Sequence, residues 1–257
     1  MTGSLLIVLA ATALGPKPVP NSNWVRSSIP PAVLAKKVDT ELHALTMKTL
    51  SYFFQFDLPH VHHGTIKCQC VFATPKQFRI QFPQVNPGGG KDEIELITLV
   101  SNGRKIGRRI EQGEVAVKAL PSRRALPDNL VENWLGNGVL ALFTAVGSST
   151  DPLSALVKAA SKPGSGYETH TETRSVVVHN RLYKYDRIVV TRTPEATKRM
   201  GSLFYEIAIN EAFMLPTSMS STVHRGKKVF YADMRGNDWA PVTSMLNPGL
   251  FDPHSRG

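Results

Sequence analysis

The sequence predicts an α+β protein in which helices cover one face of a curved antiparallel sheet. Between residues 50 and 82, apolar and polar side chains alternate in three successive stretches, as they do in strands with one wet face. Along the chain, a helix is followed by a run of strands, two or three short helices and a second run of strands. This segregation of helices from strands is typical of α+β folds.

Composition supports one folded domain after a short N-terminal segment. The 257 residues include 30 Lys+Arg and 20 Asp+Glu, so the formal net charge is +10. Hydrophobic residues make up 42% of the chain, which excludes extensive disorder. Two cysteines are too few for a disulfide scaffold or an all-cysteine zinc site. No apolar run reaches the roughly 18–20 residues that span a bilayer.

The first 23 residues resemble a secretion signal followed by a linker. Leu5–Leu14 is an apolar run of signal length, and Ala11-Thr12-Ala13 has the small-x-small form of a cleavage site. No Lys or Arg precedes the run, which leaves a mis-assigned start codon or an ordinary buried segment as alternatives. Residues 15–23 contain three prolines and read as a linker. We therefore expect an exported, periplasmic protein whose single domain is residues 24–257.

Within that domain the elements follow in order. Pro30-Pro31 suits the first turn of a helix over 29–47, whose apolar residues recur at helical spacing. Strands are expected over 50–120, with a turn at 59–64, a hairpin loop at 86–91 and a tight turn at Asn102-Gly103. A helical insert covers 128–161, and its last helix begins at the cap Asp151 and runs to about Ala160. Strands return over 168–238, and residues 239–257 are expected to be an irregular tail.

Three segments resemble the periplasmic lipoprotein-carrier (LolA-like) superfamily. Gly64–Phe82, with the sequence GTIKCQCVFATPKQFRIQF, resembles its "G-x-L-x-(apolar)-x-R-P-x-x-F-R" motif. Leu99–Gly103 resembles its "L-V-S-D-G" hairpin, and Asn210–Thr217 resembles a corner that often carries Leu-Pro. The resemblance implies an incomplete antiparallel β-barrel with an N-terminal helix and short helices over an apolar concave face.

In carrier members of that superfamily the concave face holds the acyl chains of a lipoprotein and moves them across the periplasm. Carriers place an arginine immediately before the proline, where it is thought to latch a lid; this chain has Thr74 there. The candidate lining residues are the large apolar side chains of the first three strands, and two residues of the insert are candidates for the lid. They are Phe54, Phe56, Ile66, Phe72, Phe78, Ile80 and Phe82, with Trp134 and Leu135 in the lid. Alternation alone is equally compatible with an ordinary core.

The positive charge suggests a second kind of contact. Arg104, Lys105, Arg108 and Arg109 share one hairpin and are candidates for contact with anionic headgroups at a membrane surface, or form a solvated basic face. A high pI is also typical of nucleic-acid binding. Nucleic acid is disfavoured here because the aromatic residues lie on strand faces that read as buried, and no recognition motif is present.

Signatures of catalysis are missing from the sequence. There is no Gly-x-Ser-x-Gly elbow, His-Glu-x-x-His pair, phosphate-binding glycine loop or Cys-x-x-Cys motif. Cys68 and Cys70 read as small apolar fillers, and His60, His62 and His63 as a solvated turn. We therefore expect a non-enzymatic carrier of lipid or lipoprotein acyl chains, without cofactor or metal. The alternative is an envelope scaffold or regulatory module that binds a protein through its sheet edge or lid.

Overall fold

The computed structural model describes residues 24–58, 61–88, 91–110, 115–126, 131, 146–225 and 228–254, with backbone alone for 56–58, 61–63, 84–88, 91–94, 225 and 228–238. The strands are β1 (Val25–Arg26), β2 (Lys48–Leu58), β3 (Val61–Phe72), β4 (Gln77–Gly88), β5 (Lys91–Asn102), β6 (Lys105–Ile110), β7 (Val115–Ala119), β8 (Tyr167–Val178), β9 (Arg181–Arg192), β10 (Ser202–Asn210), β11 (Leu215–Arg225) and β12 (Lys228–Pro241). The helices are α1 (Pro31–His43), α3 (Pro152–Ala160), α4 (Pro194–Met200) and the 3-10 helix η1 (Pro248–Phe251).

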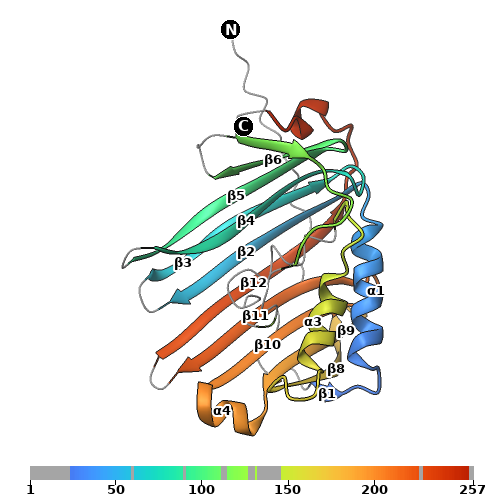
Figure 1. Cartoon of the computed structure of the whole chain (residues 1–257). Helices are drawn as coiled ribbons and strands as arrows, with labels where there is room; N and C mark the ends of the chain where they lie inside the picture. Colours follow the sequence, from blue (N-terminus) through green and yellow to red (C-terminus); the bar gives the residue numbers. More distant parts are fainter. Residues whose placement is uncertain are drawn as a thin grey trace.

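All the strands belong to one antiparallel sheet, shown in Figure 1, with the order β1-β8-β9-β10-β11-β12-β2-β3-β4-β5-β6-β7. The order begins at β1 and ends at β7, so the sheet of the described strands is open. β12 pairs with β11 on one side and with β2 on the other, and thereby joins the two runs of strands. The predicted α+β class with a single curved antiparallel sheet is confirmed.

One face of the sheet, here called the inner face, carries the hydrophobic core. Alternate residues of each strand point to it, so Leu50, Tyr52 and Phe54 of β2 are buried while Phe53 between them is exposed. Strands from both halves of the sheet contribute to a single cluster. The alternation that predicts each strand also identifies which of its side chains are buried.

Helices α1 and α3 pack against each other and against β8, with α1 also contacting β9 and β11. Figure 1 shows the two helices side by side at one end of the sheet. Leu34, Val38 and Leu42 of α1 are buried as its spacing predicts, but Val33 is exposed because it lies on the opposite side of the helix. The helix ends at His43, four residues earlier than the predicted 47.

Several predicted turns and ends are different in the structure. β3 begins at Val61, which pairs with Leu58, so the predicted turn at 59–64 is shorter. The predicted loop at 86–91 is also shorter, because β4 runs to Gly88, which pairs with Lys91. At these strand ends both faces carry polar residues and glycines, so apolar and polar side chains no longer alternate. The sequence pattern therefore cannot predict that the backbone pairing continues there.

The predicted irregular tail from residue 239 is irregular over 242–247 and 252–254, but it also contains the end of a strand and a short helix. β12 continues to Pro241, and η1 then packs on β4 and β5 with Phe251 buried. The side chain of Asn247 accepts a hydrogen bond from Gly249 N–H, which caps η1. The tail covers the outer face at Gly107, where an added Cβ would lie 2.3 Å from the carbonyl oxygen of Pro253.

The sequence pattern also misses β1 and α4. β1 is only two residues long and pairs with β8. Next to it, the ring of Trp24 lies 4.4 Å from the guanidinium carbons of both Arg174 and Arg187, on the outer face. α4 is a helix of seven residues whose cap, Thr193, accepts a hydrogen bond from Ala196 N–H. Elements this short offer too little periodicity to be predicted.

Candidate ligand-binding face

The large apolar side chains that the sequence predicts to line a ligand-binding site gather on the inner face of β2–β4. Phe72, Phe78, Ile80 and Phe82 are fully buried, and Phe54 is 6% exposed. Ile66, directly opposite Phe54, is half-buried and packs against the same cluster. The structure thus brings together the predicted lining residues whose side chains it describes. The side chain of Phe56 and all of Trp134 and Leu135 lie outside the described residues, as do most of the predicted helices over 128–146.

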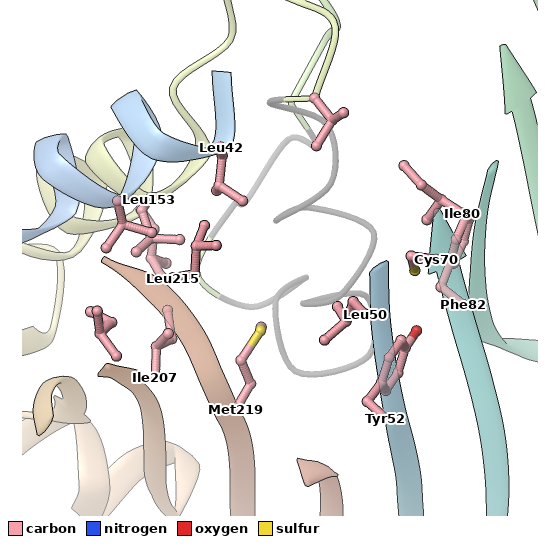
Figure 2. Packing of buried hydrophobic residues seen from close by; sticks show 14 of the residues in the cluster. Leu42, Leu50, Tyr52, Cys70, Ile80, Phe82, Leu153, Ile207, Leu215 and Met219 are labelled. Carbon is pink, nitrogen blue, oxygen red and sulfur yellow. The ribbon is translucent and has the colours of Figure 1, made fainter. Parts of the chain in front are cut away.

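The second half of the sheet faces the same interior. Figure 2 shows Leu50, Tyr52 and Phe82 of β2 and β4 together with Ile207, Leu215 and Met219 of β10 and β11, and all six belong to one buried cluster. The sequence predicts strands over 168–238 but does not join them to the candidate lining residues. The signal it lacked was the pairing of β12 with β2, which places both halves on one continuous face.

On the part of this face that β2 and β3 form, the polar groups are paired. The Tyr52 hydroxyl donates a 2.7 Å hydrogen bond to the backbone oxygen of Gln81, which also accepts from the Cys70 thiol. Burial raises the pKa of Cys68 to about 11 and raises that of Cys70 as well. Because the thiolate is the nucleophile, both cysteines are unreactive at neutral pH. This part of the face therefore offers apolar contact rather than nucleophilic chemistry.

The helix pair over the inner face is held by a buried carboxylate. Asp39 of α1 accepts hydrogen bonds from the N–H groups of Leu153 at 3.1 Å and Ser154 at 2.8 Å, and thereby caps α3. Burial outweighs these bonds and raises the pKa of Asp39. Asp151, the predicted cap, is paired instead with Lys36 and His43, each at 2.8 Å. Helix α3 does begin at Pro152 as predicted, but a residue distant in sequence supplies its cap.

A strap of two segments, residues 122–126 and 146–150, packs on the end of β4. Arg124 N–H donates to the Thr150 hydroxyl oxygen, and that hydroxyl donates to the backbone oxygen of Arg124, both at 2.8 Å. The Arg124 guanidinium lies 5.2 Å from the centre of the Phe78 ring, and burial lowers its pKa to about 10. An added Cβ on Gly147 would lie 2.5 Å from the Pro75 oxygen. The strap is thus fixed against the β3–β4 turn.

Thr74, at the position where carriers place an arginine, has a local role. Its hydroxyl oxygen accepts hydrogen bonds from the N–H groups of Lys76 and Gln77 and stabilises the β3–β4 turn. The guanidinium that reaches Phe78 comes from Arg124, in a different part of the chain. The sequence gives no spacing rule that would have identified Arg124.

The basic hairpin does not form one patch. Arg108 is paired with Leu99 and Arg109 with Thr98, so these neighbouring residues lie on opposite faces of the sheet. Lys105 shares the face of Arg109, while Arg104 lies in the turn. Arg79 is partly buried and lies near Arg109. Burial, together with the positive charge of Arg109, lowers the pKa of Arg79. The four predicted headgroup contacts are therefore divided between the inner and outer faces.

Comparison with known proteins gives structural likenesses alone, since no protein-family model and no curated protein matches the chain. LprF from Mycobacterium bovis matches with 9% identity over 84% of this chain and 96% of its own, with a TM-score of 0.39. A LolA superfamily protein from Nitrosomonas europaea matches with 10% identity over 88% and 98%, with a TM-score of 0.30. A DUF1329 family protein from Desulfovibrio piger matches with 11% identity over 86% and 95%, with a TM-score of 0.27.

The second of these structures bears the name of the superfamily that the sequence motifs resemble. Because the three TM-scores are low, the fold rests on the strand order and not on these likenesses. Among the described residues, no helix has the length and apolarity to cross a membrane.

Proposed function

We propose that this chain is a non-enzymatic carrier that holds the acyl chain of a lipid or lipoprotein against the inner face of its sheet, in an exported location. The observation that carries the proposal is the continuity of that face. Large apolar side chains from β2–β4 and from β9–β11 belong to one cluster, and the polar groups of β2 and β3 on it are paired within the protein. Such a face favours a ligand by its apolar area and not by a reactive group.

Apolar contact is the term that would hold an acyl chain. Each methylene group removed from water contributes about 0.8 kcal/mol, so a long chain gains on the order of 10 kcal/mol before costs. Association itself costs roughly 4–15 kcal/mol, so short chains are expected to bind weakly. We therefore expect affinity to rise by about fourfold for each added methylene until the face is filled.

Helices α1 and α3 cover β8, β9 and β11, so a chain that enters over these strands requires both helices to yield, and the bonds between them favour a joint movement. Asp39 ties α1 to α3, whereas the contacts of both helices with the sheet are largely apolar. The exposed pair of Lys36 and Asp151 adds little, because water and salt screen ion pairs at the surface. An acyl chain would replace one set of apolar contacts by another.

The test uses two neighbouring residues of β2 that point to opposite faces. Delipidated protein is titrated with a fluorescent fatty acid, and unlabelled acids from octanoate to stearate compete with it. Phe54→Asn, on the inner face, is expected to weaken binding at least tenfold, while Phe53→Asn, at a position that is 45% exposed, leaves it unchanged. Ile66→Asn, at a half-buried position, repeats the test if Phe54→Asn fails to fold. Absence of binding for every chain length, or equal loss in both faces' variants, would overturn the proposal.

A further inference from the structure

The hairpin between β8 and β9 exposes apolar side chains that the core does not use. Val177 and Leu182 are directly opposite each other across the hairpin and are 67% and 60% exposed. The turn residues His179 and Asn180 have φ values of 46° and 60°, as in a two-residue hairpin with both residues left-handed. The short turn and the long strand pairing hold the apolar pair at a fixed place at the end of the sheet.

Two cations lie next to the apolar pair of Val177 and Leu182 in the same hairpin. Arg181 and Lys184 are exposed, and neither forms an ion pair within the described part of the chain. Residues 175–184 contain no Asp or Glu. Of the nearest acids, Glu172 of β8 pairs with Arg187 and His170, and Asp186 of β9 is buried. The tip is therefore both apolar and positively charged.

The neighbouring turn extends the same surface. Glu211 N–H donates to the backbone oxygen of Lys184 at 3.1 Å, which places the β10–β11 turn beside β9. Phe213 of that turn is 49% exposed, and the ammonium of Lys48 lies 5.7 Å from its ring centre. Glu211 is the one acidic residue of that turn, whereas Arg181, Lys184 and Lys48 bring three positive charges to this surface. We call this surface the docking end: Val177, Leu182, Phe213, Arg181, Lys184 and Lys48.

We propose that the docking end binds the surface of an anionic bilayer. Val177, Leu182 and Phe213 enter the boundary between headgroups and acyl chains, while Arg181, Lys184 and Lys48 contact the phosphates. This combination of apolar tip and flanking cations is what interfacial membrane binding requires, because each part alone gives weak attachment. The hairpin of Arg104 to Arg109 lacks it, since the exposed large apolar residues of the described chain lie elsewhere. The proposal does not depend on an acyl-binding face.

The experiment is flotation of the full chain with vesicles of phosphatidylcholine, either alone or with about 30% phosphatidylglycerol. We expect binding to the anionic vesicles only, weakening as salt is added. The double variant Arg181→Gln/Lys184→Gln is expected to bind at least about tenfold more weakly, since each cation contributes about fivefold. Val177→Ser/Leu182→Ser is expected to lose a similar factor without any change in charge.

The matched control lies at the other end of β9. Lys198 and Arg199 of α4 are exposed, and Figure 1 shows α4 at the start of β10, opposite the docking end. Lys198→Gln/Arg199→Gln changes the net charge equally and is expected to alter vesicle binding less than threefold. Equal loss in both charge variants, or full binding by Val177→Ser/Leu182→Ser, would overturn the proposal. Fatty-acid uptake should be the same in all these variants, so failure here is distinct from failure of the carrier function.

Discussion

Asp39 shows how one buried side chain decides the position of an element. Its carboxylate replaces Asp151 as the cap of α3, and it belongs to a different helix. A local signal, Asp followed by Pro, correctly indicates where α3 begins but not which carboxylate satisfies its first N–H groups. Capping by Asp39 also fixes α1 to α3, so the residue stabilises a tertiary contact along with a helix end.

Removing this cap should destabilise the protein measurably. Asp39→Ala is expected to cost about 2 kcal/mol, or roughly 5 °C in Tm, and Asp39→Asn about half of that because its amide oxygen still accepts one bond. Thermal unfolding followed by circular dichroism measures both. Asp151→Ala is the control, since the exposed pair that it removes is screened by water and should cost clearly less than the loss of Asp39. A larger loss for Asp151→Ala than for Asp39→Ala would contradict the assignment of the cap.

Glu172 should give the fold a dependence on pH of known sign. Burial alone would raise its pKa, but hydrogen bonds from Arg187 and His170 outweigh burial and lower it. A lowered pKa means that the stabilising contribution is present above the ordinary value of 4.5 and is lost as pH falls through the folded value. Glu172→Gln should therefore cost about 2 kcal/mol at pH 7 and little at pH 3.

The raised pKa of Asp39 gives the stability of the fold a pH dependence of the opposite sign. The native state holds this proton more tightly than the unfolded chain does, so the contribution of Asp39 declines as pH rises through its folded value. The penalty of Asp39→Asn should accordingly shrink with rising pH, whereas that of Glu172→Gln grows. Denaturant unfolding at a series of pH values separates the two trends, and parallel curves would show that one assignment is wrong.

At the scale of elements, long alternating strands were predictable and short or capped pieces were not. β2, β3 and β4 follow from the alternation around Phe54, Ile66 and Phe78 because one face is buried throughout. α4 and η1 span too few residues for a period, and their caps at Thr193 and Asn247 are single residues. The contact between the tail and the outer face of β6 could not be predicted either, since a glycine at that position does not indicate that another segment packs on it.

The close contact between the C-terminal tail and β6 can be tested by a substitution. Gly107→Ala places a Cβ against the Pro253 oxygen, where the backbone of the tail must move. We expect a loss of about 1–3 kcal/mol, typical of overpacking, and faster hydrogen exchange in residues 248–254. Unchanged exchange in the tail of Gly107→Ala would exclude this contact.

At the scale of the molecule, the candidate site depends on a pairing that no local pattern contains. The lining residues of β2–β4 were predictable one by one, but their union with Ile207 and Met219 follows from β12 lying between β11 and β2. Nothing in the alternation of a strand specifies its neighbour when that neighbour is far along the chain. The sequence therefore predicts which side chains are buried, and the topology decides which of them meet.

Trp239 of β12 contacts both halves. Its ring stacks on Phe72 of β3 with centroids 5.9 Å apart, and its Nε1–H donates to the Pro216 oxygen of β11 at 2.8 Å. Trp239→Ala should cost about 3 kcal/mol and make β8–β11 and β2–β7 exchange amide hydrogens at different rates. Trp239→Phe keeps the stacking and should lose only the hydrogen bond, about 1 kcal/mol. Uniform exchange across both halves in Trp239→Ala would contradict this linking role.

The place of β12 has a consequence for biosynthesis. β2 is among the first strands made, yet the strand that pairs with one of its edges is among the last. At roughly 5–20 residues per second, the ribosome needs on the order of ten seconds to supply it. During that interval the nascent chain exposes an unpaired backbone edge beside Phe54, which is open to aggregation. A holding chaperone, or passage through a translocon before folding, would protect the newborn polypeptide until its final segment emerges.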